Sequence, residues 1–179
     1  KSRKMVATIT EKRRLTEEEY FAFEEAKGEK YEFHNGKISK MPEATTNHNI
    51  IAMNIALAIK MVLKAKNKKH YVLGSDTKIH IPNIKRFVYP DAVVIAEEIQ
   101  HYENRKDTII NPLLIVEVLT RKFEKCQTIN SFKEYVLIEQ DFPEIVAYHR
   151  EERDLWRVQR NDDLESGEID LKSIDCKIK

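Results

Sequence analysis

The pattern of hydrophobic and polar residues along the chain predicts several strands. Strict alternation over residues 78–81, where polar side chains are separated by isoleucines, predicts a half-buried strand. Residues 113–119 are apolar at nearly every position, which is typical of a central strand covered by helices. Residues 87–96 form a second apolar run that predicts a strand. Pro90 lies in its early part, and this position is acceptable because proline has no N–H to donate inside a sheet. Shorter runs predict strands over 135–138, 145–148 and 155–158.

The N-terminal part of the chain predicts two helices and a hairpin. Thr16 and Glu19 form a capping box that starts a short helix. Residues 30–41 predict a hairpin, because Asn35-Gly36 is a sequence preferred in type I′ turns. The longest helix is expected over residues 48–66, and its apolar content predicts that it is largely buried. Its candidate N-caps are Thr45, Thr46 and Asn47.

Composition indicates a single globular domain over residues 1–179. The chain has 41% hydrophobic and 34% charged residues, which suits a folded protein with a sizeable core. The longest apolar stretch, residues 50–63, is shorter than the roughly 20 residues of a membrane span, so no membrane partner is expected. No secretory signal pattern precedes it, and Cys126 and Cys176 are too few for a disulfide framework. We therefore expect a cytoplasmic protein.

The net charge of +1 bears on possible partners. A protein that holds nucleic acid by bulk charge is usually clearly basic, so this chain would contact DNA only through a local patch.

Two carboxylates lie in apolar segments, where a charged side chain is unfavourable. Asp91 follows Pro90 at the head of an apolar run, and Glu117 lies in the middle of the run over 113–119. Buried carboxylates are almost always paired, and two of them on neighbouring strands would repel each other. A shared hard cation, which binds oxygen ligands, would keep both ionised. The pair therefore predicts a divalent-metal site and chemistry on phosphate.

Phosphodiester hydrolysis needs more than the metal. The cation neutralises the phosphate and lowers the pKa of an attacking water, and a positioned base or cationic partner assists. Lys122 follows Glu117 by five residues and could reach back to the metal. The backbone carbonyl of Val118 is a further candidate oxygen ligand.

The order of Pro90-Asp91, Glu117 and Lys122 resembles the PD-(D/E)XK nuclease superfamily. A longer ordered series of segments is similar to the Uma2 family of restriction-endonuclease-like proteins. These segments are residues 30–36, 48–49, 74–76, 89–91, 107–112, 115–119, 122–124 and 134–138. The resemblance places the nuclease-like core over about residues 15–160, with an N-terminal extension over 1–14 and a C-terminal tail over 161–179.

The resemblance implies an α/β (α+β) fold, with a restriction-endonuclease-like mixed central β-sheet flanked by helices. It implies a Mg²⁺-dependent endonuclease acting on DNA, with Mn²⁺ as a possible substitute, and a homodimer. Transferred to this chain, Asp91 and Glu117 are metal ligands and catalytic residues, and Lys122 is the catalytic lysine. Glu32 would complete the acidic cluster. His48 and Asp76 match polar positions near the site and are assigned to substrate binding.

One departure from the family keeps a second hypothesis open. Related sequences carry a longer loop after the glutamate strand, whereas Thr120-Arg121 here leads directly into Lys122. A non-catalytic binding or assembly module, with the nuclease fold and an impaired metal site, is therefore the alternative. A hydrolase of small phosphate esters is a third option. Taken singly, Glu117 could be a structural charge paired with Arg86, and Glu32 an exposed strand residue.

Overall fold

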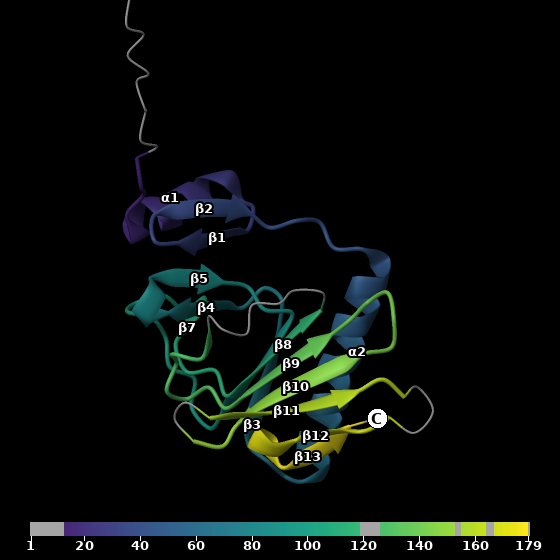
Figure 1. The fold of residues 1–179 in the computed structure, drawn as a ribbon. Coiled ribbons are helices and arrows are strands. Elements are labelled where there is room, and N and C mark those ends of the chain that lie inside the picture. The colour runs from purple at the N-terminus through teal and green to yellow at the C-terminus, as the bar shows by residue number, and fades with distance from the viewer. Residues whose placement is uncertain (1–12, 119–125, 153–154, 164–166, 179) are drawn as a thin grey trace, which may run out of the picture.

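The computed structural model describes residues 13–118, 126–152, 155–163 and 167–178. These residues form a mixed α+β fold with two α-helices and three sheets (Figure 1). The sequence-predicted fold class is thus confirmed. One central sheet organises the fold, and different elements cover its two faces.

The central sheet has six strands in the order β11-β10-β9-β8-β6-β3. Their bounds are β3 His70–Gly74, β6 Ala92–Ala96, β8 Leu114–Val118, β9 Glu134–Ile138, β10 Ile145–Arg150 and β11 Trp156–Asn161. The sheet is mixed, because β8 runs parallel to β9 and antiparallel to β6. All residues of β8 and β9 are buried, so the central strand predicted around residues 113–119 is confirmed.

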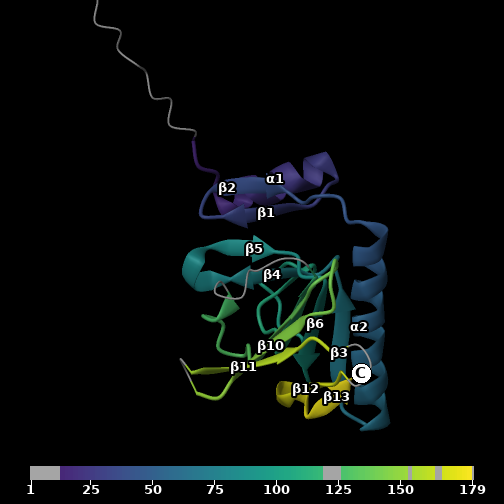
Figure 2. The same cartoon turned by 45° about the vertical axis from the view of Figure 1, so that its right-hand side comes forward.

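Helix α2 (Thr46–Ala65) runs along one face of this sheet, as the turned view shows (Figure 2). Thr45 caps it through a hydrogen bond from the backbone N–H of His48. The expectation that this helix is largely buried is wrong. Only Ile55, Ile59 and Leu63 are buried, since the sheet covers a single side of the helix.

The opposite face of the central sheet packs against a second sheet, not against helices. This sheet has the order β2-β1-β5-β4-β7. Its strands are β1 Tyr31–His34, β2 Lys37–Lys40, β4 Lys78–Ile81, β5 Arg86–Val88 and β7 Thr108–Ile109, and a 3₁₀ turn over Pro82–Ile84 joins β4 to β5. Side chains of β4 and β5 share a buried cluster with β6, β8 and β9. Helix α1 (Glu17–Lys27) packs on the second sheet through Tyr20.

The predicted capping box and hairpin are both confirmed. Thr16 and Glu19 hydrogen-bond reciprocally at the start of α1. Asn35 and Gly36 have φ values of 47° and 86°, as a type I′ turn between β1 and β2 requires.

Two strand predictions need correction. Residues 87–96 are not one strand, because β5 belongs to the second sheet and β6 to the central sheet. The chain crosses between the sheets at Tyr89-Pro90-Asp91, where proline has no N–H to offer a ladder. Strand β4 is fully buried and not half-buried, because Lys78 pairs with acidic side chains and His80 stacks on Phe87.

The C-terminal residues form a hairpin that the sequence pattern did not identify. Strands β12 (Ile169–Leu171) and β13 (Cys176–Ile178), joined by a 3₁₀ turn over Lys172–Ile174, bury their apolar side chains beside α2 and the central sheet. The buried carboxylate of Glu134 anchors this hairpin. It accepts hydrogen bonds from the backbone N–H groups of Lys172 and Ser173 and from the Ser173 hydroxyl.

The anchor at Glu134 predicts a pH-dependent stability. Burial raises the pKa of Glu134 to about 7, although the hydrogen bonds from residues 172 and 173 lower it. The folded state therefore holds a proton that the unfolded state releases near pH 4.5. This contribution to stability is complete below pH 4.5 and is lost as the pH rises towards 7, on the order of 3 kcal/mol.

The measurement is urea unfolding of wild type and Glu134→Gln across this pH range. We expect the free energy of unfolding of wild type to fall relative to that of the variant as the pH rises. His149, which faces Glu134 at 3.9 Å, is present in both proteins and titrates in both. Parallel pH profiles would contradict the prediction.

Candidate active site

Asp91 and Glu117 lie at the same end of two neighbouring strands. The register of β6 and β8 pairs Ala92 with Val116, and the two carboxylates flank this pair directly in the sequence. Asp91 Oδ2 also accepts a hydrogen bond of 2.7 Å from the backbone N–H of Val118. The expected adjacency of these strands is confirmed, and the hydrogen bond fixes the Asp91 side chain against the end of β8.

The first turn of α2 brings His48 to the same place. Its Nε2 lies 3.2 Å from Asp91 Oδ2. The side chains of His48 and Asp91 are 17% and 11% exposed, and Glu117 is buried. The helix start is held by Thr45, whose hydroxyl donates to Gln140 after the end of β9 at 2.6 Å.

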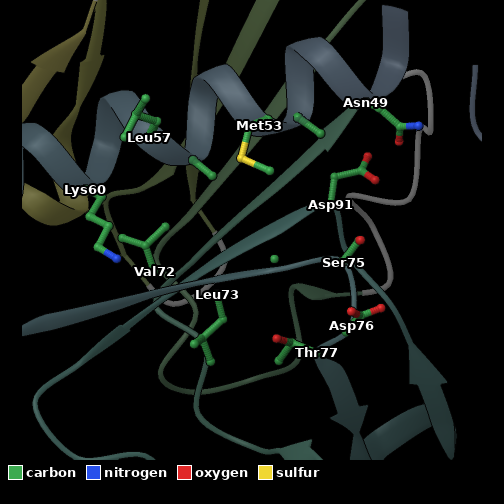
Figure 3. A pocket seen from close by; sticks show the side chains of 13 residues that line it. Asn49, Met53, Leu57, Lys60, Val72, Leu73, Ser75, Asp76, Thr77 and Asp91 are labelled. Atoms are coloured by element: carbon green, nitrogen blue, oxygen red, sulfur yellow. The ribbon is translucent and has the colours of Figure 1, made fainter. Parts of the chain in front are cut away.

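The two carboxylates open into a cavity of about 640 Å³. Among the residues that line it are Lys30, Lys40, Glu43, His48, Ser75, Tyr89, Asp91, Glu117, Val118 and Gln140. Asp91 also borders a second cavity of about 620 Å³ between α2 and β3 (Figure 3). Four residues line both spaces, namely Asn49, Ala52, Ser75 and Asp91. Asp91 therefore lies where the two cavities adjoin.

Asp76 lies in the turn between β3 and β4 and lines the second cavity (Figure 3). Its side chain is 92% exposed, and Oδ1 forms an ion pair with Lys30 Nζ at 2.5 Å. Asp76 is thus near Asp91 in the fold, but its described contact is with a lysine of the first cavity.

Glu32 is carried by a different sheet from Asp91 and Glu117. It belongs to β1 of the second sheet, is buried, and pairs with Arg86 of β5 at 3.1 Å. It is absent from the described lining of both cavities. The idea that Glu32 is an exposed strand residue is therefore wrong, whereas its place in the acidic cluster stays a prediction. The predicted catalytic lysine, Lys122, lies outside the residues that the structure describes.

Lys30 was not among the predicted site residues, although it begins one of the segments shared with the Uma2 family. Lys30 lies next to β1, far in sequence from Asp91, and no local pattern marks it. Tyr89, which begins the shared segment 89–91, was likewise not among the predicted site residues. Its ring lines the cavity and lies 5.7 Å from Lys30 Nζ.

The donor atoms fit a hard cation. Two carboxylates and the backbone oxygen of Val118 are the ligand type that Mg²⁺ prefers. Within the described part of the chain, no group of three or more His, Cys, Asp or Glu side chains forms a closed metal cage. Mg²⁺ sites commonly use one or two carboxylates and complete the shell with water and substrate phosphate, so an open site of this kind is sufficient.

Comparison with known proteins gives a consistent result. The family profile described as "Uma2: Putative restriction endonuclease" matches residues 17–174. The uncharacterized protein sll1609 of Synechocystis sp. is 34% identical over 135 residues, which cover 70% of this chain and 75% of that protein. The uncharacterized protein slr1290 of the same organism is 29% identical over 172 residues, with coverages of 88% and 87%.

A solved structure shares the fold. The crystal structure of a putative nuclease belonging to DUF820 from Anabaena variabilis matches with a TM-score of 0.70. The identity is 17%, and the match covers 90% of this chain and 91% of the other. At this identity the match supports a common fold.

Proposed function

This chain belongs to the Uma2 family, described as putative restriction endonucleases, and from that premise we propose that it is a Mg²⁺-dependent endonuclease that hydrolyses DNA phosphodiester bonds. One observation carries the proposal. Asp91 and Glu117 lie side by side at the end of two buried strands and line an open cavity. Together with the backbone carbonyl of Val118, the two carboxylates supply the oxygen donors that a hard divalent cation takes, and this donor set supports a metal site.

Each residue has a role in this proposal. Asp91 and Glu117 hold the metal, with the Val118 carbonyl as a further ligand. The bound metal supplies charge neutralisation and a water of lowered pKa. Val118 N–H and His48 orient the Asp91 carboxylate, because both lie within 3.2 Å of its Oδ2. The resemblance assigns Lys122 to charge stabilisation at the reacting phosphate.

The test is incubation of the protein with supercoiled plasmid DNA in Mg²⁺, in Mn²⁺ and in EDTA. We expect nicking or linearisation with either metal and none in EDTA. A folded protein that cleaves no DNA at protein excess would favour the non-catalytic module instead. Activity on small phosphate esters, with none on DNA, would move the substrate class to small molecules.

We further propose that the chain forms a homodimer through the outer side of α2. Four large apolar side chains of this helix, together with one from β3, are at least half exposed. They are Ile50, Met53, Leu57, Met61 and Tyr71. The helix is long and apolar enough to cross a membrane by composition, yet only 17% of its most apolar window is buried. Such an exposed apolar surface marks an interaction site.

A second copy of the chain is the occupant that the surface area supports. Each of these side chains exposes on the order of 100 Å². Two copies would then bury roughly 1,000 Å², which reaches the lower limit of a specific interface. A twofold axis places the same surface on both subunits, as a self-complementary apolar stripe allows.

The double variant Met53→Glu, Leu57→Glu is expected to convert a dimer into a monomer, because it buries four like charges across the twofold axis. Light scattering after size exclusion measures the mass. Val158→Glu on edge strand β11, at a residue that is also half exposed, is the matched control and should leave the dimer intact. A wild-type monomer, or a dimer that persists in the double variant, would refute this interface.

A further inference from the structure

Lys30 is the side chain whose contacts suggest a role beyond the metal site. Its ammonium donates a hydrogen bond of 3.0 Å to the backbone carbonyl of Ser75 and forms an ion pair with Asp76. It also lies 5.7 Å from the ring centroid of Tyr89, within range of a cation–π contact. Lys30 lines the same cavity as Asp91 and Glu117. Ser75 and Asp76, in the turn after β3, and Tyr89, before β6, therefore hold the Lys30 ammonium at the wall of the candidate active site.

The carboxylates of this cavity give it a negative charge that a lysine ammonium would partly neutralise. Its described lining includes the carboxylates of Glu43, Asp91 and Glu117, and a phosphodiester that enters adds a further negative charge. A bound divalent ion offsets only part of this total. Lys40 also lines the cavity, but its ammonium pairs with Glu29 at 2.7 Å. Lys30 is the better candidate, because the Tyr89 ring, 5.7 Å from its ammonium, would keep that ammonium at the cavity wall after an exchange of partners.

The partner of Lys30 is easily exchanged. The Asp76 side chain is 92% exposed and that of Lys30 is 40% exposed. Ion pairs this exposed contribute little free energy, so a phosphate oxygen can replace the Asp76 carboxylate at low cost. A phosphate oxygen at Lys30 also makes a charge-assisted hydrogen bond, which is stronger than a neutral one.

We propose that Lys30 binds a backbone phosphate of the DNA substrate in this cavity, and that Asp76 is the counter-ion that it releases. This inference rests on the proposed function, because it names how the same site holds its substrate. It makes Lys30 a substrate-binding residue and Asp76 a competitor of the phosphate. Asp76 would then oppose substrate binding, in contrast to the supporting role that the sequence suggested.

The proposal predicts opposite effects for the two partners of one ion pair. Lys30→Met should weaken DNA binding and reduce the slope of log affinity against log salt concentration by about 1, as expected for one lost phosphate contact. Asp76→Asn should tighten binding several-fold, because it removes the competing carboxylate. If the pair only fastened the turn after β3, both variants would disturb the site in the same direction.

A second ion pair of the protein provides matched controls. Lys66 pairs with Asp175 at 3.4 Å and also donates to the Asp175 backbone carbonyl. The two side chains are 44% and 82% exposed, close to the values for Lys30 and Asp76. Lys66 ends α2 at the opposite end from His48 and is absent from the described lining of either cavity. Lys66→Met and Asp175→Asn thus make the same charge changes away from the site.

The experiment measures anisotropy of a labelled DNA duplex across a salt series, in Ca²⁺ and in EDTA, with gel analysis for cleavage. Opposite shifts at Lys30 and Asp76, with smaller shifts in both control variants, would support the proposal. DNA binding by wild type with equal effects of Lys30→Met and Lys66→Met would overturn it and leave the proposed function standing. A wild type that binds no DNA in either buffer would overturn both. Binding that depends on Lys30 without cleavage in Mg²⁺ would support the phosphate site and reject hydrolysis.

Discussion

Asp91→Asn is expected to lower DNA cleavage on the order of 10³-fold or more and to abolish detectable Mg²⁺ binding. Loss of one preorganised charge-stabilising group alone costs about 10²–10³-fold, and this variant also removes a metal ligand. Asn keeps the size of Asp and retains an oxygen that can accept the hydrogen bond from Val118 N–H. The fold should therefore survive the change, and the loss would report on the chemistry of the carboxylate.

Calorimetric titration of Mg²⁺ and Mn²⁺, with plasmid cleavage on the same samples, measures both effects. Glu117→Gln should behave in the same way, because the two carboxylates are proposed to share one ion. Glu43→Gln is the matched control, since Glu43 lines the same cavity but is exposed and lies outside the two paired strands. Full cleavage by Asp91→Asn would reject the proposed site. Loss of metal binding without loss of cleavage would show that the reaction does not need this ion.

Glu24→Ala is expected to lower the free energy of unfolding by about 3–5 kcal/mol, because it leaves a buried lysine without its main partner. Lys78 on β4 is 1% exposed and pairs with Glu24 of α1. A second carboxylate, Asp107, is 3.7 Å from the same ammonium. Three aromatic rings surround Lys78 at 4.9–5.5 Å, namely those of Tyr20, Phe21 and Tyr89.

Glu24 has several other donors to satisfy, which adds to the cost of its removal. Its Oε1 accepts hydrogen bonds from the Tyr89 hydroxyl at 2.7 Å and from the Tyr31 N–H at 3.1 Å. Without the carboxylate, these buried groups would lose an acceptor. Burial of its side chain raises the pKa of Tyr89, and the hydrogen bond to Glu24 raises it further.

Urea unfolding provides the measurement, and Glu25→Ala on the exposed side of α1 is the control, expected within about 0.5 kcal/mol of wild type. The double variant Glu24→Gln, Lys78→Met should recover part of the loss. Replacing both members of a buried pair removes the unpaired charge as well as the attraction. A loss below about 1 kcal/mol in Glu24→Ala would show that water or Asp107 compensates for the missing partner.

Most elements were predictable because their signals are local. A capping box, an Asn-Gly turn and an apolar run each depend on a few neighbouring residues, and α1, the β1–β2 hairpin and β8 follow from them. The three errors concern relations between distant segments, and one of them is the burial of β4, which depends on the partners of Lys78 and His80 in other elements. The exposed side of α2 depends on how much sheet lies beneath it, and the split at Pro90 depends on the presence of a second sheet.

The candidate site divides in the same way. The sequence by itself determined that Asp91 directly precedes one buried strand and that Glu117 lies within another. The order of these motifs determined the family. Only the tertiary structure decided that His48 contacts Asp91, that Glu32 pairs with Arg86, and that Lys30 reaches the cavity from the first hairpin. The physical reason is that charged side chains form contacts across strands and sheets. Which charges meet depends on the strand order and on where the chain crosses between sheets, and no local pattern of residues encodes either.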